Sequence, residues 1–163
     1  MSIFAKPMAA MKPRTTTAGQ VAVLYAGVLV VFAIAQLFTF EEFLELTPQF
    51  GLPFGEAFGY LLAPLLIACE VFAIPFLLRM AVSPAFRWLS GALSMLVAVL
   101  WFFIAVWIVT TRASVTTIGF LGTVGDLTPG WWAVLIVVAL TILAAWSVWG
   151  LWPTARGHSI KKR

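Results

Sequence analysis

The sequence predicts an all-α protein, a four-helix transmembrane bundle. Its 163 residues are 63% hydrophobic and only 10% charged, and the mean hydropathy is +1.05. Both fractions lie well outside the range that is usual for soluble domains. Four apolar stretches of about 20 residues, the length that crosses a bilayer, occupy most of the chain. We therefore expect residues 1–163 to form a single integral membrane domain.

Polar and turn-forming segments separate the predicted spans. The spans are expected at about residues 20–40, 56–80, 86–111 and 131–152. Residues 41–55 combine acids, phenylalanines, prolines and glycines, which predicts a short interfacial helix followed by a break. Residues 112–130 form the longest polar loop. Pro64 and Pro75 fall inside the second span, where each removes one backbone hydrogen bond and frees the carbonyl four residues earlier.

Positive residues are strongly biased toward one side of the predicted membrane. That side holds all lysines and arginines except Arg112, namely Lys6, Lys12, Arg14, Arg79, Arg87, Arg156, Lys161, Lys162 and Arg163. The positive-inside rule makes this side cytoplasmic, so both termini are expected in the cytoplasm and the protein in a bacterial-type plasma (inner) membrane. The opposite side carries the acids Glu41, Glu42, Glu45, Glu56 and Asp126. This acidic rim either attracts a cationic partner or solute, or is a by-product of topology.

Several classes of function are excluded by what the sequence contains. The net charge of +4 comes without a basic stripe interleaved with exposed aromatic residues, so no nucleic-acid partner is expected. The single cysteine, Cys69, rules out an internal disulfide and any Cys-x-x-Cys motif. The single histidine, His158, leaves no intramembrane pair for a haem, and no predicted span carries a lysine for a retinal Schiff base. No metal site is expected.

Glu70 is the only ionisable side chain deep inside a predicted span. A charge in hydrocarbon costs roughly 2.5 to 3.5 kcal/mol even on lenient insertion scales, so such a residue is a functional-site hypothesis by default. Because desolvation disfavours the charged form, we expect a neutral acid that can donate a hydrogen bond. Three functional interpretations follow: a proton acceptor, a polar handle for a quinone or bound lipid, or a bond to a partner's helix.

Further candidate site residues lie on the other predicted spans. Ser94 and Thr141 are expected within a turn or two of the depth of Glu70, and in the structural interpretation they tie the spans to it. Gln36, one turn inside the outer end of the first span, is expected to join helices. Arg112 is the one cation within the acidic rim. The eight tryptophans are interpreted as an aromatic belt at the span ends.

Three stretches resemble the DoxX/MauE group of small four-helix membrane proteins. They are GVLVVFAIAQLFTFEEFLE, FGLPFGEAFGYLLAPLLIACEVFAIPFLLRM and SPAFRWLSGALSMLVAVLWFFIAVW. In that group a Gly-Leu-Pro element, here Gly51, Leu52 and Pro53, leads into a second span with a glutamate, here Glu70. The resemblance implies association with redox systems, such as thiosulfate oxidation by quinone or the maturation of amine-oxidising enzymes.

Two features of the group are absent from this chain. A lysine common near the outer end of the first span is replaced by Gln36, and the Cys-rich outer segment of MauE-like members is replaced by TTIGFLGT. Without those thiols, a dithiol relay run by this chain alone is not expected.

The leading hypothesis for function is a non-catalytic accessory or binding subunit of a membrane-bound redox or transport assembly. It rests on the lack of a metal cluster, nucleophile triad, phosphate loop or paired intramembrane carboxylates in the sequence. The alternative is a quinone-linked oxidoreductase component in which Glu70 handles protons. A third hypothesis is a small lipid or solute carrier. The expected partners are membrane lipids and either another protein or further copies of this chain.

Overall fold

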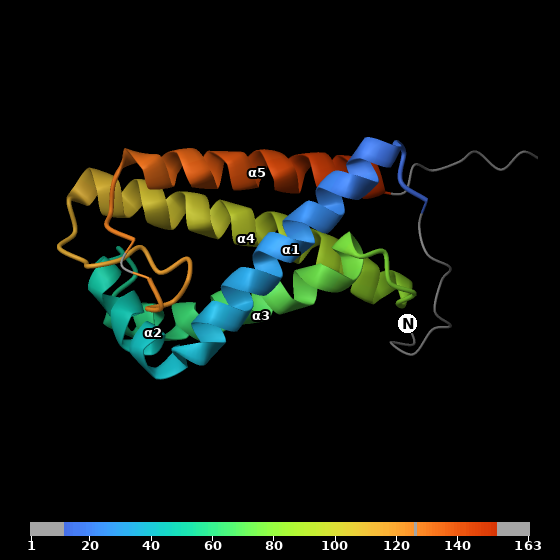
Figure 1. Ribbon diagram of the computed structural model, residues 1–163. Coiled ribbons are helices and arrows are strands. Elements are labelled where there is room, and N and C mark those ends of the chain that lie inside the picture. The colour runs from blue at the N-terminus through green and yellow to red at the C-terminus, as the bar shows by residue number, and fades with distance from the viewer. Residues whose placement is uncertain (1–11, 126, 153–163) are drawn as a thin grey trace, which may run out of the picture.

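The computed structural model describes residues 12–125 and 127–152, in which helices joined by turns and loops are present and no strand is found. Four helices are long and apolar enough to cross a membrane. They are α1 (Thr16–Phe38), α3 (Glu56–Leu77), α4 (Pro84–Thr111) and α5 (Trp131–Leu151). The predicted four-helix membrane bundle is confirmed (Figure 1). The basic residues of 1–11 and 153–163, which entered the prediction of orientation, lie outside the described residues.

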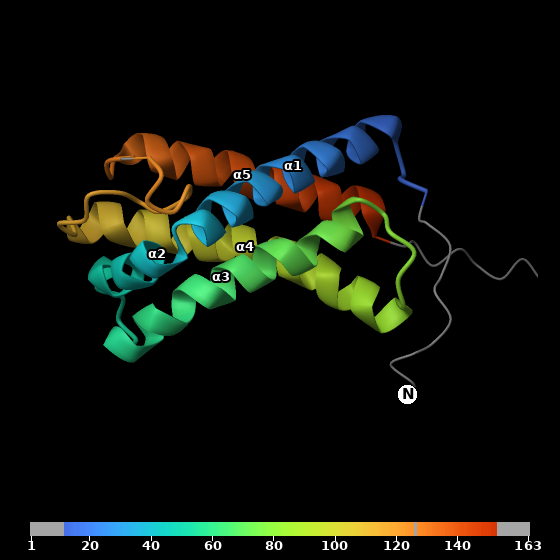
Figure 2. The same cartoon turned by 60° about the horizontal axis from the view of Figure 1, so that its bottom comes forward.

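Each long helix packs against two others. Helices α1 and α4 both contact α3 and α5, and α1 crosses the bundle obliquely while α4 and α5 run side by side (Figures 1 and 2). The two ends of the described chain meet, because the backbone N–H of Arg14 donates to the carbonyl of Gly150 at 2.9 Å. We name this end, with Lys12, Arg14, Arg79 and Arg87, the basic end. The opposite end, with Glu41, Glu42, Glu45 and Glu56, is the acidic end.

Helix α1 begins and ends earlier than the sequence predicts. It starts at Thr16 rather than near residue 20, because the hydroxyl of Thr15 accepts the N–H of Ala18 at 3.1 Å and caps a polar first turn. Hydropathy does not detect such a turn. The helix ends at Phe38, because Thr39 leaves the helical conformation at φ −115° and ψ 37°.

Residues 41–55, the predicted interfacial segment, fold mainly into α2 (Phe40–Leu46) and the 3-10 helix η1 (Thr47–Phe50). Gly51 ends η1 in the left-handed conformation, with φ 60°. Phe43 and Phe50 are completely buried, and both short helices pack against α3. The short helix expected here is therefore present, and one face of it belongs to the protein core.

A hydroxyl from α4 binds the backbone of α3 beside Pro75. Ser90 accepts the N–H of Phe76 at 3.0 Å and donates to the carbonyl of Phe72. The sequence predicts that Pro75 frees the carbonyl of Val71. The Ser90 hydroxyl binds the carbonyl of Phe72, the next residue along the helix. Membrane helices tolerate proline where a neighbouring helix supplies such a polar group.

Helix α3 ends at Leu77, somewhat before the predicted limit at residue 80. The N–H of Arg79 donates to Phe76 at 3.0 Å and that of Met80 to Pro75 at 2.9 Å, the two bonds of a Schellman motif. Arg79 occupies the left-handed position of this motif, with φ 58°, where glycine is usual. The motif stops the helix although the apolar sequence continues.

Large apolar side chains cover the outside of the long helices, as lipid contact requires. Leu24 of α1, Leu135 of α5 and Ile142 of α5 are all exposed. Soluble proteins rarely expose so many large apolar side chains together, so these faces are suited to contact with membrane lipid. The chain is a membrane protein.

Helices α1 and α5 approach closely at Gly150. A Cβ added there would lie 2.3 Å from the Cβ of Ala18. We expect Gly150→Ala to lower the free energy of unfolding by about 1–3 kcal/mol through overpacking. Gly27→Ala is the control, since nothing lies within 4 Å of a Cβ at that position. Thermal unfolding in mild detergent, followed by circular dichroism, measures both; equal midpoints would contradict the close crossing.

Candidate functional site

The candidate site is built around one carboxylate oxygen of Glu70. The residue faces the bundle interior from α3 and is 0% exposed. Its Oε1 accepts the indole N–H of Trp101, from α4, at 2.9 Å. The same oxygen accepts an amide N–H of Gln36, from α1, at 3.2 Å. Three of the long helices are thus joined at a single atom.

Gln36 extends this group to the loop 112–130. Its Nε2 also donates to the carbonyl of Phe120 at 3.2 Å, and the side chain is completely buried. A backbone carbonyl can only accept, so the nitrogen of the amide rather than its oxygen faces the loop. One amide group therefore holds both Glu70 and the loop backbone.

Three aromatic rings pack together beside the carboxyl group. Phe120 lies 4.8 Å from Trp101 edge to face and 5.6 Å from Phe32 in a stacked arrangement, measured between ring centroids. Phe32 and Trp101 are 6.4 Å apart. All three residues are buried. This cluster shields the Glu70 hydrogen bonds from bulk solvent, which strengthens them.

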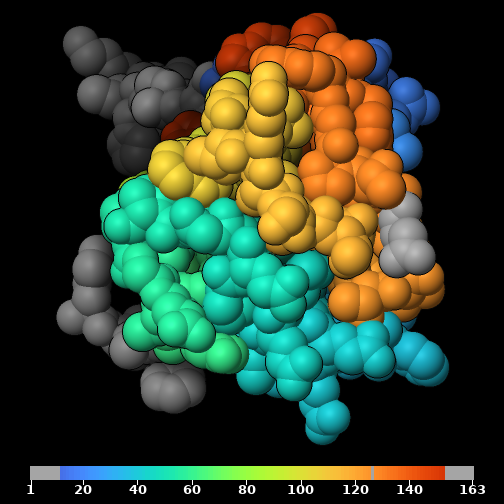
Figure 3. All heavy atoms as spheres, turned by 90° about the vertical axis from the view of Figure 1, so that its left-hand side faces the viewer, coloured from blue at the N-terminus to red at the C-terminus, as the bar shows by residue number. Residues whose placement is uncertain are grey.

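Two glycines turn the loop back over the end of α1. Gly119 and Gly122 have φ 85° and 58°, and a Cβ on Gly122 would lie 2.3 Å from Oγ1 of Thr39. The N–H of Thr123 donates to that same hydroxyl at 3.1 Å, and the Thr123 hydroxyl bonds to Glu42 of α2. We name α2, η1 and residues 113–125 and 127–130 the cap; its atoms cover the acidic end in Figure 3.

Two polar atoms of the site have no hydrogen-bond partner among the described residues. They are Oε2 of Glu70 and Oε1 of Gln36, both buried. A buried acceptor without a donor is costly. A bound water could donate to either oxygen, whereas a proton on Oε2 would turn that atom into a donor that needs an acceptor of its own. The described residues hold no group of histidine, cysteine and acidic side chains that could bind a metal ion.

The other predicted site residues are placed elsewhere. The Ser94 hydroxyl donates to the carbonyl of Gly91 at 2.7 Å, and the Thr141 hydroxyl to that of Val137 at 2.7 Å, each within its own helix. Arg112 is exposed at the end of α4, in the left-handed conformation with φ 51°. The structure therefore brings together Glu70 and Gln36 of the predicted set.

Sequence reasoning missed Trp101 and Phe120. The assignment of all tryptophans to an aromatic belt is wrong for Trp101, which is completely buried and donates to Glu70. Its position, well inside the predicted span 86–111, was an available signal. Phe120 lies in a polar, glycine-containing loop, and no periodicity marks it as buried.

Fold and site define a small four-helix membrane protein in which the buried carboxyl group of Glu70 joins the helices to a cap. Comparison with protein-family models, curated proteins and solved structures found no match. The resemblance to the DoxX/MauE group accordingly stays a prediction from the residues that carry it.

Replacing Glu70 tests its role as a shared acceptor. Glu70→Leu leaves the indole N–H of Trp101 and one amide N–H of Gln36 unpaired, and we expect a loss of about 2 kcal/mol in the free energy of unfolding. Glu70→Gln keeps an oxygen acceptor and is expected to lose less than about 1 kcal/mol. Unfolding in mild detergent, followed by tryptophan fluorescence, compares them. If Glu70→Gln were as unstable as Glu70→Leu, the acid itself and not its acceptor oxygen would be required.

Proposed function

We propose that this chain is a non-catalytic accessory or binding subunit of a membrane-bound redox or transport assembly. The observation that carries the proposal is that the Glu70 side chain is enclosed and hydrogen-bonded within the chain. Glu70 has no exposed surface, and Trp101 and Gln36 donate hydrogen bonds to its Oε1. A group enclosed in this way is suited to holding the cap in place, and a substrate would have to displace packed side chains to reach it.

The surface of the cap supports a binding role. A hollow of about 590 Å³ lies between η1 and the start of α3, and Glu45 and Glu56 are among its lining residues. Close to it in sequence, Phe54 is 66% exposed, and Val124 of the loop is 61% exposed. Acids beside exposed apolar side chains suit a partner that offers a basic and apolar surface.

The redox link and the orientation rest on the sequence. Gly51, Leu52, Pro53 and Glu70 carry the resemblance to DoxX/MauE proteins, which associate with redox systems. The bias of lysine and arginine toward the basic end supports a cytoplasmic location of that end in a bacterial-type inner membrane. The cap would then face the outside, where an extracytoplasmic partner could bind it.

Photo-crosslinking from the cap tests the binding role. A photoreactive phenylalanine analogue at Phe54 is expected to give a discrete adduct with another protein in native membranes. The same analogue at Leu135, which is 70% exposed on α5, is the control and should give only lipid products. Gel electrophoresis and mass spectrometry identify the adducts. Adducts only between two copies of the 17.8 kDa chain, or equal adducts from both positions, would contradict an accessory role.

A second candidate function is proton handling by Glu70 for a quinone bound among the helices. The two unpaired acceptors, Oε2 of Glu70 and Oε1 of Gln36, favour it, because a ligand hydroxyl could donate to either oxygen. Glu70→Gln keeps the shape and the acceptor while deleting titration. Under this candidate function, quinone-dependent electron transfer in membranes falls at least tenfold in the variant, although its free energy of unfolding falls by less than about 1 kcal/mol. Unaltered electron transfer would dismiss the candidate function.

A further inference from the structure

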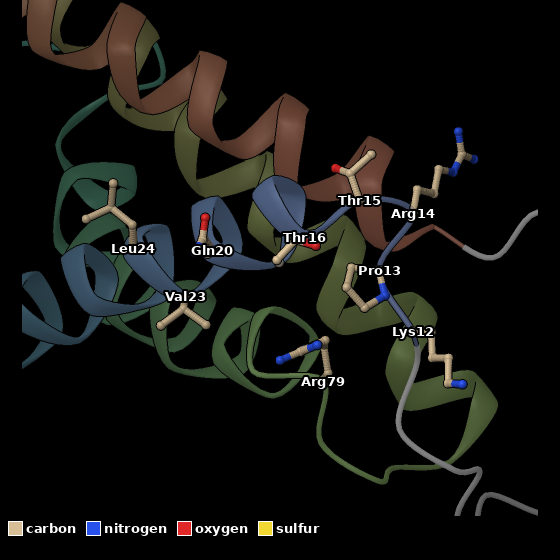
Figure 4. Close-up of a pocket in the computed structure, with 10 residues that line it drawn as sticks. Lys12, Pro13, Arg14, Thr15, Thr16, Gln20, Val23, Leu24 and Arg79 are labelled. Atoms are coloured by element: carbon tan, nitrogen blue, oxygen red, sulfur yellow. The ribbon is translucent and has the colours of Figure 1, made fainter.

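A basic hollow lies at the start of α1. It has a volume of about 770 Å³ and is lined by residues 12–16 and by Gly19, Gln20, Val23, Leu24 and Arg79. Lys12 and Arg14 come from the segment that enters α1, whereas Arg79 reaches toward α1 from the turn between α3 and α4 (Figure 4). Arg14 points to the other side of that segment, where its guanidinium lies 5.1 Å from the ring centroid of Trp149.

The backbone holds Arg79 beside this hollow. Its left-handed conformation, φ 58°, is fixed by the Schellman motif that ends α3. An Nη1 atom of its guanidinium lies 3.9 Å from where a Cβ on Gly19 would be, so the absence of a side chain at Gly19 leaves it room. The guanidinium has no hydrogen-bond or ion-pair partner among the residues the structure describes. A guanidinium group binds carboxylate and phosphate groups, so an anion would supply the partner that Arg79 lacks among the described residues.

No acid balances these cations. The six acids of the sequence are Glu41, Glu42, Glu45, Glu56, Glu70 and Asp126, and none lies in residues 1–40, 71–125 or 127–163. The hollow therefore offers positive charge to an anionic phosphate and no carboxylate to the ammonium group of a zwitterionic lipid. The first turn of α1 likewise contains no acid.

An apolar groove continues from the hollow along α1. Val23 and Leu24 line both. The groove has a volume of about 550 Å³ and is lined by Val23, Leu24, Gly27, Val28, Val31 and Phe32. At 1.5 Å per residue it follows the helix for about 14 Å, close to the half-thickness of about 15 Å of a bilayer's hydrocarbon core. Gly27 deepens it, because nothing lies within 4 Å of a Cβ at that position.

We infer that the basic hollow and the groove together form a binding site for one anionic phospholipid. The phosphate lies at the guanidinium of Arg79, and an acyl chain lies along α1 past Gly27. A basic head site continuous with an apolar channel of leaflet depth matches a lipid better than a free phosphate, which leaves the groove without a function. The inference does not depend on the proposed accessory role.

The test measures thermal unfolding of the full chain in nonionic detergent with added lipid. Phosphatidylglycerol is expected to raise the midpoint in a saturable manner, since a ligand of the folded state stabilises it. Phosphatidylcholine with the same acyl chains and inorganic phosphate are expected to have little effect. Equal shifts with both lipids would contradict a preference for an anionic headgroup. A shift with inorganic phosphate equal to that with phosphatidylglycerol would contradict the assignment of the ligand as a lipid.

Two arginines with the same backbone conformation provide a matched pair of variants. Arg79→Gly removes the charge from the hollow, and glycine fits φ 58° better than arginine, so the fold is retained. Phosphatidylglycerol is expected to bind about fivefold more weakly. Arg112→Gly, at φ 51° near the opposite end, should leave binding unchanged. An equal loss in both variants would make the effect one of net charge and overturn the site.

The groove is tested separately from the charge. Gly27→Leu places a side chain in the path of the acyl chain without altering any cation, and phosphatidylglycerol binding is expected to weaken at least fivefold. Gly27→Ala, which adds one methyl group, should bind nearly as well as the natural chain. Unchanged binding in Gly27→Leu would overturn the placement of the lipid along α1.

Discussion

The structure depends on Oε1 of Glu70, which accepts hydrogen bonds from Trp101 and Gln36 in a region closed to bulk solvent. In hydrocarbon every N–H group needs an acceptor inside the protein, and a carboxyl group offers more acceptor positions than any other side chain. The described lysines and arginines lie at the ends of the bundle, so no cation pairs with Glu70. Glu70 is therefore best understood as a shared acceptor and not as half of an ion pair.

This interaction couples the cap to the helices. Helix α1 ends at Phe38, less than one turn after Gln36, and the loop crosses the space that a longer helix would fill. The absence of a side chain at Gly122 permits that crossing, because a Cβ there would lie 3.1 Å from Cα of Gln36 and clash with Thr39. The amide of Gln36 then binds the loop through the carbonyl of Phe120. Loss of the shared acceptor should loosen the cap as well as the bundle.

Hydropathy predicted the four spans because membrane crossing imposes a length and a composition on each helix. It also singled out Glu70 and Gln36, since polar groups inside apolar runs are few. Their partners could not be found in this way. Phe120 reaches the site by a loop whose path depends on Gly119 and Gly122, and Trp101 is one apolar residue among many on α4. Hydroxyls were equally ambiguous: Ser94 and Thr141 bind the backbone of their own helices, while Ser90, which was not singled out, joins α4 to α3.

The two halves of the molecule use their polar groups differently. Toward the acidic end, polar groups form hydrogen bonds within the chain. These groups are the N–H donors of Gln36 and Trp101 and the hydroxyls of Thr39 and Thr123. At the basic end, Arg79 adopts a backbone conformation that costs a non-glycine residue roughly 1–2 kcal/mol, and the described residues give its guanidinium no acid in return. A cation near a helix C-terminus recovers part of that cost through the helix dipole. An anion bound in the hollow would give the Arg79 guanidinium the partner that the described residues do not supply, which is the physical reason to place the phospholipid there.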